Sequence, residues 1–259
     1  MGIKKVLFQF VKFVGIKNSY LQSLMLVKDK LGIRSKFHDE LKLFYAPLIK
    51  NQSLVFDIGA NIGSRTLIFQ ELAGRVIALE PNPDLFLILK KRFGSNGKIV
   101  TVKRGCAAES GITSFYLGSN HLVSSFSKKF ISFKKSIGED RQWTKEVKVD
   151  LTTLDLLIAE YGLPQFCKID VEGFEWPVIS GLSQKIPLLS FEFTLPVFEE
   201  ETYNCLMHLS ELGYMKFNIV LGEGVRFHLD DWVNMEQLKN ELKNLNYSGP
   251  QNYGDIYAR

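Results

Sequence analysis

The chain has 259 residues, of which 46% are hydrophobic and 23% charged, and its net charge is +4. These values are ordinary for a globular protein and exclude a disordered chain, a collagen-like repeat and a coiled coil. The length fits one large α/β domain, alone or with a small helical extension. No apolar run reaches the roughly 18 residues that a membrane-spanning helix needs. Three widely separated cysteines without a CxxC pair indicate neither a zinc cluster nor a disulfide framework.

The basic charge is concentrated at the start of the chain. Residues 1–36 carry eight Lys or Arg residues and one acid, a net charge of +7, which leaves −3 for the remainder. Four apolar residues of this segment share one helical face: Ile3, Leu7, Phe10 and Val14. Such a helix suits an anionic membrane surface, the main domain or a second subunit. We predict a basic helical arm over residues 1–50 and a cytoplasmic protein. Peripheral membrane contact through the arm and the oligomeric state stay open.

From Leu54 the sequence alternates between strand and helix patterns. Short apolar runs predict strands over 54–60, 75–81 and 98–108, and helices over 63–73 and 82–94 separate them. Strands that alternate with helices of this length indicate βαβ units and a parallel sheet.

The middle of the chain departs from this rhythm. Residues 111–149 predict an antiparallel excursion with a Ser- and Lys-rich loop, where we expect acceptor contacts because loops carry specificity. The alternation then resumes, with strands over 165–173, 187–195, 214–222 and 254–259 and helices over 174–182, 199–212 and 229–247. We therefore predict one α/β domain over residues 51–259.

The turn after the first strand, in "VFDIGANIG", predicts a ligand site. Ligands of open parallel sheets bind at the carboxyl ends of the strands, where glycines and helix N-termini face them. Glu80 ends the second strand and is placed to accept both ribose hydroxyl protons. The turn lacks the middle glycine of the dinucleotide fingerprint, and Asp57 repels a pyrophosphate but attracts a cation. S-adenosylmethionine has a ribose and two cationic groups without a phosphate, so it fits this pattern.

Four segments resemble, in order, the motifs of the FkbM family of S-adenosylmethionine-dependent methyltransferases: "VFDIGANIG", "ALEPNP", "VKVDLTTLDLLI" and "FCKIDVEGFEWPVISG". The resemblance covers about residues 54–195. It implies the Rossmann-like class I methyltransferase fold, a mostly parallel seven-stranded sheet with helices on both faces. It also implies O-methylation of hydroxyls on sugars, glycans or small-molecule natural products.

The resemblance also implies which residues hold the cofactor. Those expected to line its methionine and ribose part are Asp57, Gly59, Asn61 and Gly63. Glu80 is expected to hold the ribose, and the residues expected beside the adenine are Pro81, Asn82, Cys106 and Ala107. Asp170 is expected to face the methionine end and the reacting methyl group.

Methyl transfer to a hydroxyl requires a base that removes the hydroxyl proton. Strand alternation places Asp170 and Glu172 on one side of the chain, and we predict Glu172 as the base. His121, in the excursion, is a second candidate, whereas Glu175 is expected to complement the N-terminus of its own helix. Asp170 and Glu192, on adjacent strands, leave open a divalent metal that the family resemblance does not require.

Three alternatives remain at this stage. An N-methyltransferase or nucleic-acid methyltransferase shares the fold, but "DVEG" stands where amino-group enzymes often carry an Asp/Asn-Pro-Pro-aromatic motif. Nucleic acid is also disfavoured because the basic charge lies in the arm and not on the catalytic domain. A non-catalytic cofactor-binding module is opposed by the intact first turn, and a nicotinamide oxidoreductase by the missing glycine.

Overall fold

The computed structural model describes residue 32 and residues 34–118, 124–137, 143–245 and 252–259. The chain forms two compact units, residues 1–39 and 40–259. The predicted amphipathic face of the arm lies outside the described residues. Among those described, no helix is both long and apolar enough to cross a membrane.

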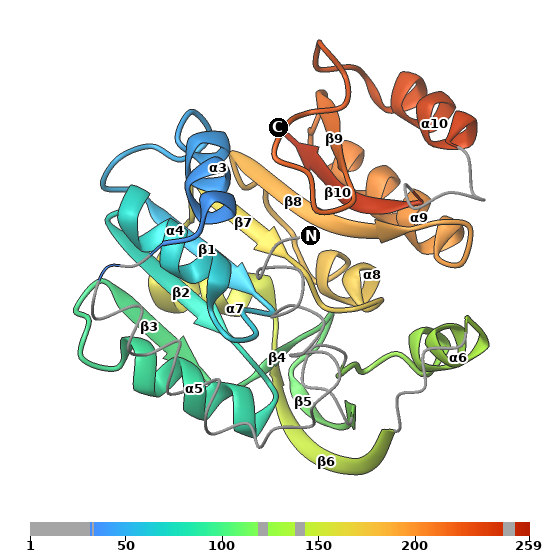
Figure 1. The fold of residues 1–259 in the computed structure, drawn as a ribbon. Helices are drawn as coiled ribbons and strands as arrows, with labels where there is room; N and C mark the ends of the chain where they lie inside the picture. Colours follow the sequence, from blue (N-terminus) through green and yellow to red (C-terminus); the bar gives the residue numbers. More distant parts are fainter. Residues whose placement is uncertain (1–31, 33, 119–123, 138–142, 246–251) are drawn as a thin grey trace, which may run out of the picture. The chain divides into compact units, whose positions relative to one another are not determined.

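The central element of the second unit is a seven-stranded sheet (Figure 1). Its strand order is β3-β2-β1-β7-β8-β10-β9, and only the pairs made by β10 are antiparallel. The seven strands are β1 (Leu54–Ile58), β2 (Arg75–Leu79), β3 (Ile99–Val102), β7 (Phe166–Ile169), β8 (Leu188–Thr194), β9 (Phe217–Leu221) and β10 (Tyr253–Ala258). The order reverses at β1, so the switch point lies beside the turn that the sequence singles out. The predicted class I methyltransferase fold is confirmed.

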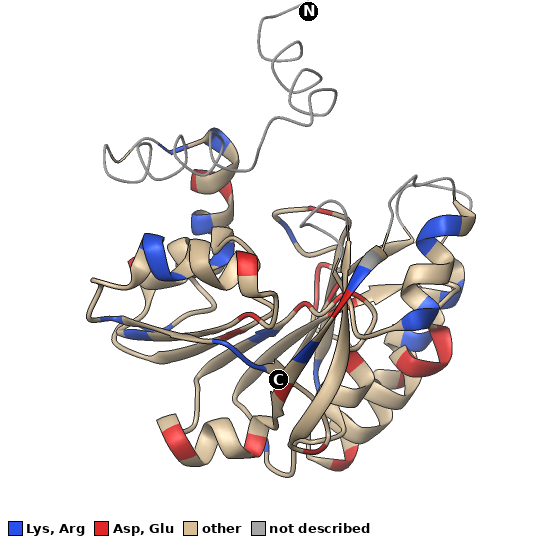
Figure 2. Ribbon diagram, turned by 90° about the horizontal axis from the view of Figure 1, so that it is seen from below, with Lys and Arg blue, Asp and Glu red and all other residues tan. Residues whose placement is uncertain are grey.

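Helices cover both faces of this sheet, which explains why β1 is buried on both sides and is apolar except for Asp57. One core lies under α3 (Lys36–Tyr45), α4 (Ser64–Leu72) and α5 (Pro83–Phe93). The other core lies under α7 (Leu154–Tyr161), α8 (Glu175–Ile179), α9 (Glu199–Glu211) and α10 (Met235–Asn244). Figure 2 shows most charged segments on helices and connections, around strands that are largely uncharged.

A second, three-stranded sheet has the order β4-β6-β5 and consists of β4 (Gly105–Cys106), β5 (Gly111–Gly118) and β6 (Trp143–Thr152). The pair β5–β6 is antiparallel and lies within the predicted excursion. The predicted strand over 98–108 is divided, because β3 ends at Val102 and β4 joins the second sheet.

The Ser- and Lys-rich segment, expected to be a loop, contains helix α6 (Lys128–Ser136). Ser127 caps this helix by accepting a hydrogen bond from the backbone N–H of Phe130. Phe130 and Ile131 are buried, so tertiary packing stabilises a helix whose surface lysines resemble a loop composition.

Candidate active site

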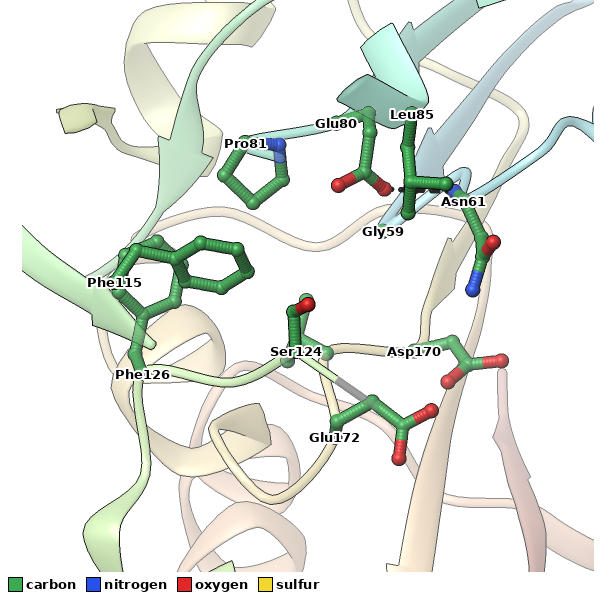
Figure 3. A pocket seen from close by; sticks show the side chains of 11 residues that line it. Gly59, Asn61, Glu80, Pro81, Leu85, Phe115, Ser124, Phe126, Asp170 and Glu172 are labelled. Atoms are coloured by element: carbon green, nitrogen blue, oxygen red, sulfur yellow. Dashed lines mark hydrogen bonds between the residues drawn. The ribbon is translucent and has the colours of Figure 1, made fainter. Parts of the chain in front are cut away.

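A cleft opens where β1, β2 and β7 end and the second sheet approaches them. It holds about 530 Å³ of empty space, a volume that includes open solvent at its mouth. Its lining residues are Gly59, Asn61, Glu80, Pro81, Leu85, Phe115, Ser124, Phe126, Asp170, Val171 and Glu172. Figure 3 shows Phe115 and Phe126 at one end, the carboxylates of Asp170 and Glu172 at the other, and Glu80 and Ser124 between them. The cleft thus has an aromatic end and an acidic end.

The loop after β1 is shaped by two left-handed residues, Gly59 with φ +85° and Asn61 with φ +51°. A Cβ on Gly59 would lie 1.8 Å from the carbonyl oxygen of Asp170, so no other residue fits there without movement of the backbone. The side-chain oxygen of Asn61 accepts the backbone N–H of Ile62, and asparagine tolerates the left-handed region better than most residues. The loop is therefore pressed against the chain that leaves β7, and both segments line the cleft.

Glu80 lies at the centre of the cleft and is 4% exposed. Its Oε2 accepts the backbone N–H of Asn61 at 2.8 Å, and its Oε1 accepts that of Asn82 at 2.8 Å. Burial raises the pKa of Glu80 to about 7, and the two backbone donors oppose this shift. Each oxygen keeps a second acceptor site, so the carboxylate is able to bind a vicinal diol from two directions.

Asn82 connects the second strand to the second sheet. Its side-chain oxygen caps α5 by accepting the N–H groups of Asp84 and Leu85, and Pro83 occupies the first helical turn. Its side-chain NH2 donates to the hydroxyl of Ser124 at 3.2 Å. That hydroxyl also accepts the N–H of Gly118. Asn82 is absent from the lining of the cleft and instead holds a wall residue in place.

Asp170 and Glu172 both reach the cleft, but a turn and not strand alternation brings them there. β7 ends at Ile169, and Glu172 has a left-handed backbone with φ +55°, which is uncommon for a residue other than glycine. The carbonyl of Glu172 accepts the Ser125 hydroxyl at 2.7 Å. Such outliers persist where the surrounding structure fixes them, and they cluster at functional sites.

Glu175 stabilises this turn by accepting hydrogen bonds from its backbone. The N–H groups of Val171 and Gly173 donate to Glu175 Oε1 at 3.1 and 3.3 Å. The side chain is buried, and burial raises its pKa to about 7. Glu175 therefore orders the turn that presents Glu172, and it is absent from the lining of the cleft.

The aromatic end of the cleft comes from residues that the sequence analysis did not single out. Phe115 lies in β5, Phe126 follows the wall residue Ser124, and their rings are 4.5 Å apart between centroids. The other lining residues that the sequence did not indicate are Leu85, Ser124 and Val171. The alternation of buried residues in "SFYLG" was the available signal, since Phe115 and Leu117 point inward.

Two residues of the first motif lie away from the cleft. Asp57 is 2% exposed and accepts the hydroxyl of Thr66, in α4, at 2.5 Å. A Cβ on Gly63 would lie 2.5 Å from Phe93 and 2.7 Å from Leu89, so this glycine permits α5 to pack closely. Both residues fix the helices that frame the loop, and neither lines the cleft in the described structure.

Two further predicted residues are not brought to the cleft. Cys106 is buried in the core under α7, and the N–H of Ala107 donates to the carbonyl of Thr152. The division of the predicted strand draws both into the second sheet. His121, the second candidate for the base, lies outside the described residues.

A divalent metal between Asp170 and Glu192 does not fit the described geometry. The buried ammonium of Lys168 lies 2.9 Å from Asp170 Oδ2, so the oxygen that would have to bind the metal already has a cationic partner. Glu192 lines a separate small cavity, and burial raises its pKa well above the usual value, reinforced by Asp170 and Glu172. Among the described residues, no group of three or more His, Cys, Asp or Glu side chains is placed to hold a metal.

Three buried carboxyl groups predict how stability depends on pH. Burial raises the pKa of Asp57 to about 6 and those of Glu80 and Glu175 to about 7, so the folded state binds these protons more tightly than the unfolded chain. The contribution of these groups to the free energy of unfolding is therefore greatest at low pH, and it is lost as the pH rises through 6–7. We expect the ligand-free Tm to fall between pH 5.5 and 8 at constant ionic strength, and less steeply in Glu80→Gln. A Tm that is flat or rises over this range would contradict the assignment.

Four observations indicate that the cleft suits S-adenosylmethionine. Phe115 and Phe126 offer an apolar surface for a flat base. Glu80 has acceptor sites for two ribose hydroxyls, and Asp170 lies at the end where a cationic amino-acid group would gain from a carboxylate. Gly59, which has no side chain, allows the loop after β1 to lie close to the chain after β7 at the edge of the cleft.

Comparison with known proteins identifies the family. The Methyltransferase FkbM domain matches residues 57–216. The hexuronic acid methyltransferase AglP of Haloferax volcanii is 26% identical over 148 residues, and the match covers 55% of each protein. The chain thus spans about half the length of this relative.

Two solved structures match this chain with lower sequence identity. An FkbM methyltransferase from Methylobacillus flagellatus KT is 15% identical with a TM-score of 0.49, over 83% of this chain and 46% of that one. Aeropyrum pernix fibrillarin with bound S-adenosylmethionine is 10% identical with a TM-score of 0.43, over 85% and 73%. The domain match, in contrast, spans more than half of the chain and includes Glu80, Asp170 and Glu172. The chain belongs to the FkbM family of S-adenosylmethionine-dependent methyltransferases.

Proposed function

We propose that this methyltransferase O-methylates a hydroxyl group on a sugar, a glycan or a small-molecule natural product. The observation that carries the proposal is the position of Glu172, whose side chain lines the acidic end of the same cleft as Glu80. A hydroxyl is a poor nucleophile until a base takes its proton, and a carboxylate at this end supplies that base.

The chain's own residues divide the work between binding and proton removal. S-adenosylmethionine supplies an activated methyl group on a sulfonium, so the protein mainly orients the acceptor and accepts its proton. Glu80 and the aromatic end fix the nucleoside part, and Asp170 lies toward the amino-acid end. Glu172 would accept the proton of the acceptor's hydroxyl as the hydroxyl oxygen takes the methyl group, and the thioether S-adenosylhomocysteine would leave. Ser125 and Glu175 hold the turn that presents Glu172.

The class of acceptor is supported by one relative. AglP is named as a hexuronic acid methyltransferase, and its 26% identity over 55% of each protein points to a sugar acceptor. A small polar acceptor such as a sugar agrees with the acidic end.

The acceptor is tested by methyl transfer from isotopically labelled S-adenosylmethionine to a panel of neutral sugars, uronic acids, amines and RNA. We expect labelled sugar products that resist mild alkali, because a methyl ether is stable whereas a methyl ester on a uronic acid is hydrolysed. An alkali-labile product would place the methyl group on a carboxylate. Transfer to amines or RNA alone would favour N-methylation or nucleic-acid methylation and overturn the proposal.

A further inference from the structure

Lys168 is a buried cation directly behind the cleft. It lies in β7, and its side chain is 2% exposed. The other residues of this buried strand are apolar, so a lysine is unexpected there. Its Nζ lies 2.9 Å from Asp170 Oδ2 and 3.5 Å from Asp255 Oδ1. Burial lowers the pKa of Lys168, but Asp170 and Asp255 outweigh burial and raise the pKa well above its usual value. The lysine is therefore charged throughout the physiological range.

The sheet is built so that this lysine reaches across a neighbouring strand. β8 lies between β7 and β10, and Ser190 in β8 is paired with Lys168 on one side and Tyr257 on the other. Paired residues of adjacent strands share a face, so the lysine passes over the small side chain of Ser190 to reach Asp255 in β10. The register thus lets one cation in β7 reach a carboxylate in β10 across β8.

The two partners of the lysine differ in their surroundings. The Asp170 side chain is 41% exposed and lines the cleft, whereas that of Asp255 is 16% exposed and does not line it. Asp255 therefore serves to compensate the buried charge, and Asp170 is the partner that faces a ligand. Without the lysine, the Asp170 carboxylate would lose the contact that fixes its orientation, because Lys168 Nζ is the donor described for Oδ2.

We propose that Lys168 is a positioning residue, which holds the Asp170 carboxylate in the orientation that binds the amino-acid end of the cofactor. The inference rests on the cleft being the cofactor site. It assigns a function to a residue that touches neither the cofactor nor the acceptor, and it explains why a charge is buried in a core strand at the cost of its hydration.

A double-mutant cycle tests this coupling through the affinity for S-adenosylhomocysteine, measured by calorimetry on the full chain. We expect Lys168→Met and Asp170→Asn each to weaken binding about 10-fold, and the double variant to be little weaker than either single variant. A lysine that only stabilises the fold would lower Tm but leave affinity unchanged in folded protein. Wild-type affinity in Lys168→Met, or losses that multiply in the double variant, would overturn the proposal.

A second variant covers the case in which Lys168→Met does not fold because Asp255 is left buried and unpaired. Lys168→Met with Asp255→Asn removes the buried pair and leaves Asp170 with access to solvent, an exchange that proteins often tolerate. We expect this variant to bind about 10-fold more weakly than Asp255→Asn alone, and equal affinities would overturn the proposal. If the wild type does not bind S-adenosylhomocysteine, the cofactor site itself is wrongly placed, which is a distinct failure.

Discussion

Glu172→Gln is expected to lower kcat for methyl transfer by about 100- to 1,000-fold, because it removes the base but keeps the size of the side chain. Affinity for S-adenosylhomocysteine is expected to change by less than about threefold, since the reacting proton belongs to the acceptor and not to the cofactor. Single-turnover rates and calorimetry on the same preparation measure the two effects separately.

The matched control is Glu200→Gln, at an exposed position in the first turn of α9. It makes the same chemical change away from the cleft and is expected to leave both kcat and affinity unaltered. A Glu172→Gln variant with near-normal kcat would remove Glu172 from proton transfer. His121 would then be the next residue to test.

Gly59→Ala is expected to abolish cofactor binding and to lower the free energy of unfolding by about 3 kcal/mol, with a Tm about 10 °C lower. The new Cβ would lie 1.8 Å from the Asp170 carbonyl oxygen, and the backbone at φ +85° disfavours any side chain. Relief of this clash requires the loop after β1 to separate from the chain after β7, and both of these segments line the cleft.

Gly97→Ala provides the comparison, because a Cβ at Gly97 meets no atom within 4 Å. We expect its Tm and its affinity for S-adenosylhomocysteine to match the wild type. If Gly59→Ala also binds normally, the loop does not need the close contact described here, and the geometry of the site would require revision.

Much of the fold follows from the sequence because local signals and burial agree. The apolar run of β1 and the Asn-Pro entry and basic last turn of α5 each predict the element that forms. The second sheet is less predictable, since β4 has only two residues and depends on pairing with distant β6. The sequence did not indicate helix α6, because only two of its residues, Phe130 and Ile131, are buried, and they are buried by tertiary contacts.

The sequence predicted the residues at the centre of the cleft but not those at its aromatic end. Glu80 and Asp170 follow strands that end at the switch point, so topology alone brings them together. Asp57 and Gly63 belong to the same motif but serve the packing of α4 and α5, a distinction that spacing does not reveal. Phe115 and Phe126 come from the second sheet, whose position over the cleft is a tertiary property.

The central claim is that Glu80 binds the ribose of S-adenosylmethionine in this cleft, and calorimetric titration with S-adenosylhomocysteine tests it most directly. The comparison is between the wild type, Glu80→Ala and the exposed control Glu211→Ala. Because Glu80→Ala loses two charge-assisted hydrogen bonds, we expect it to bind at least about 100-fold more weakly than the wild type. The control is expected to bind as tightly as the wild type. Equal affinity in folded Glu80→Ala and wild type would contradict the account.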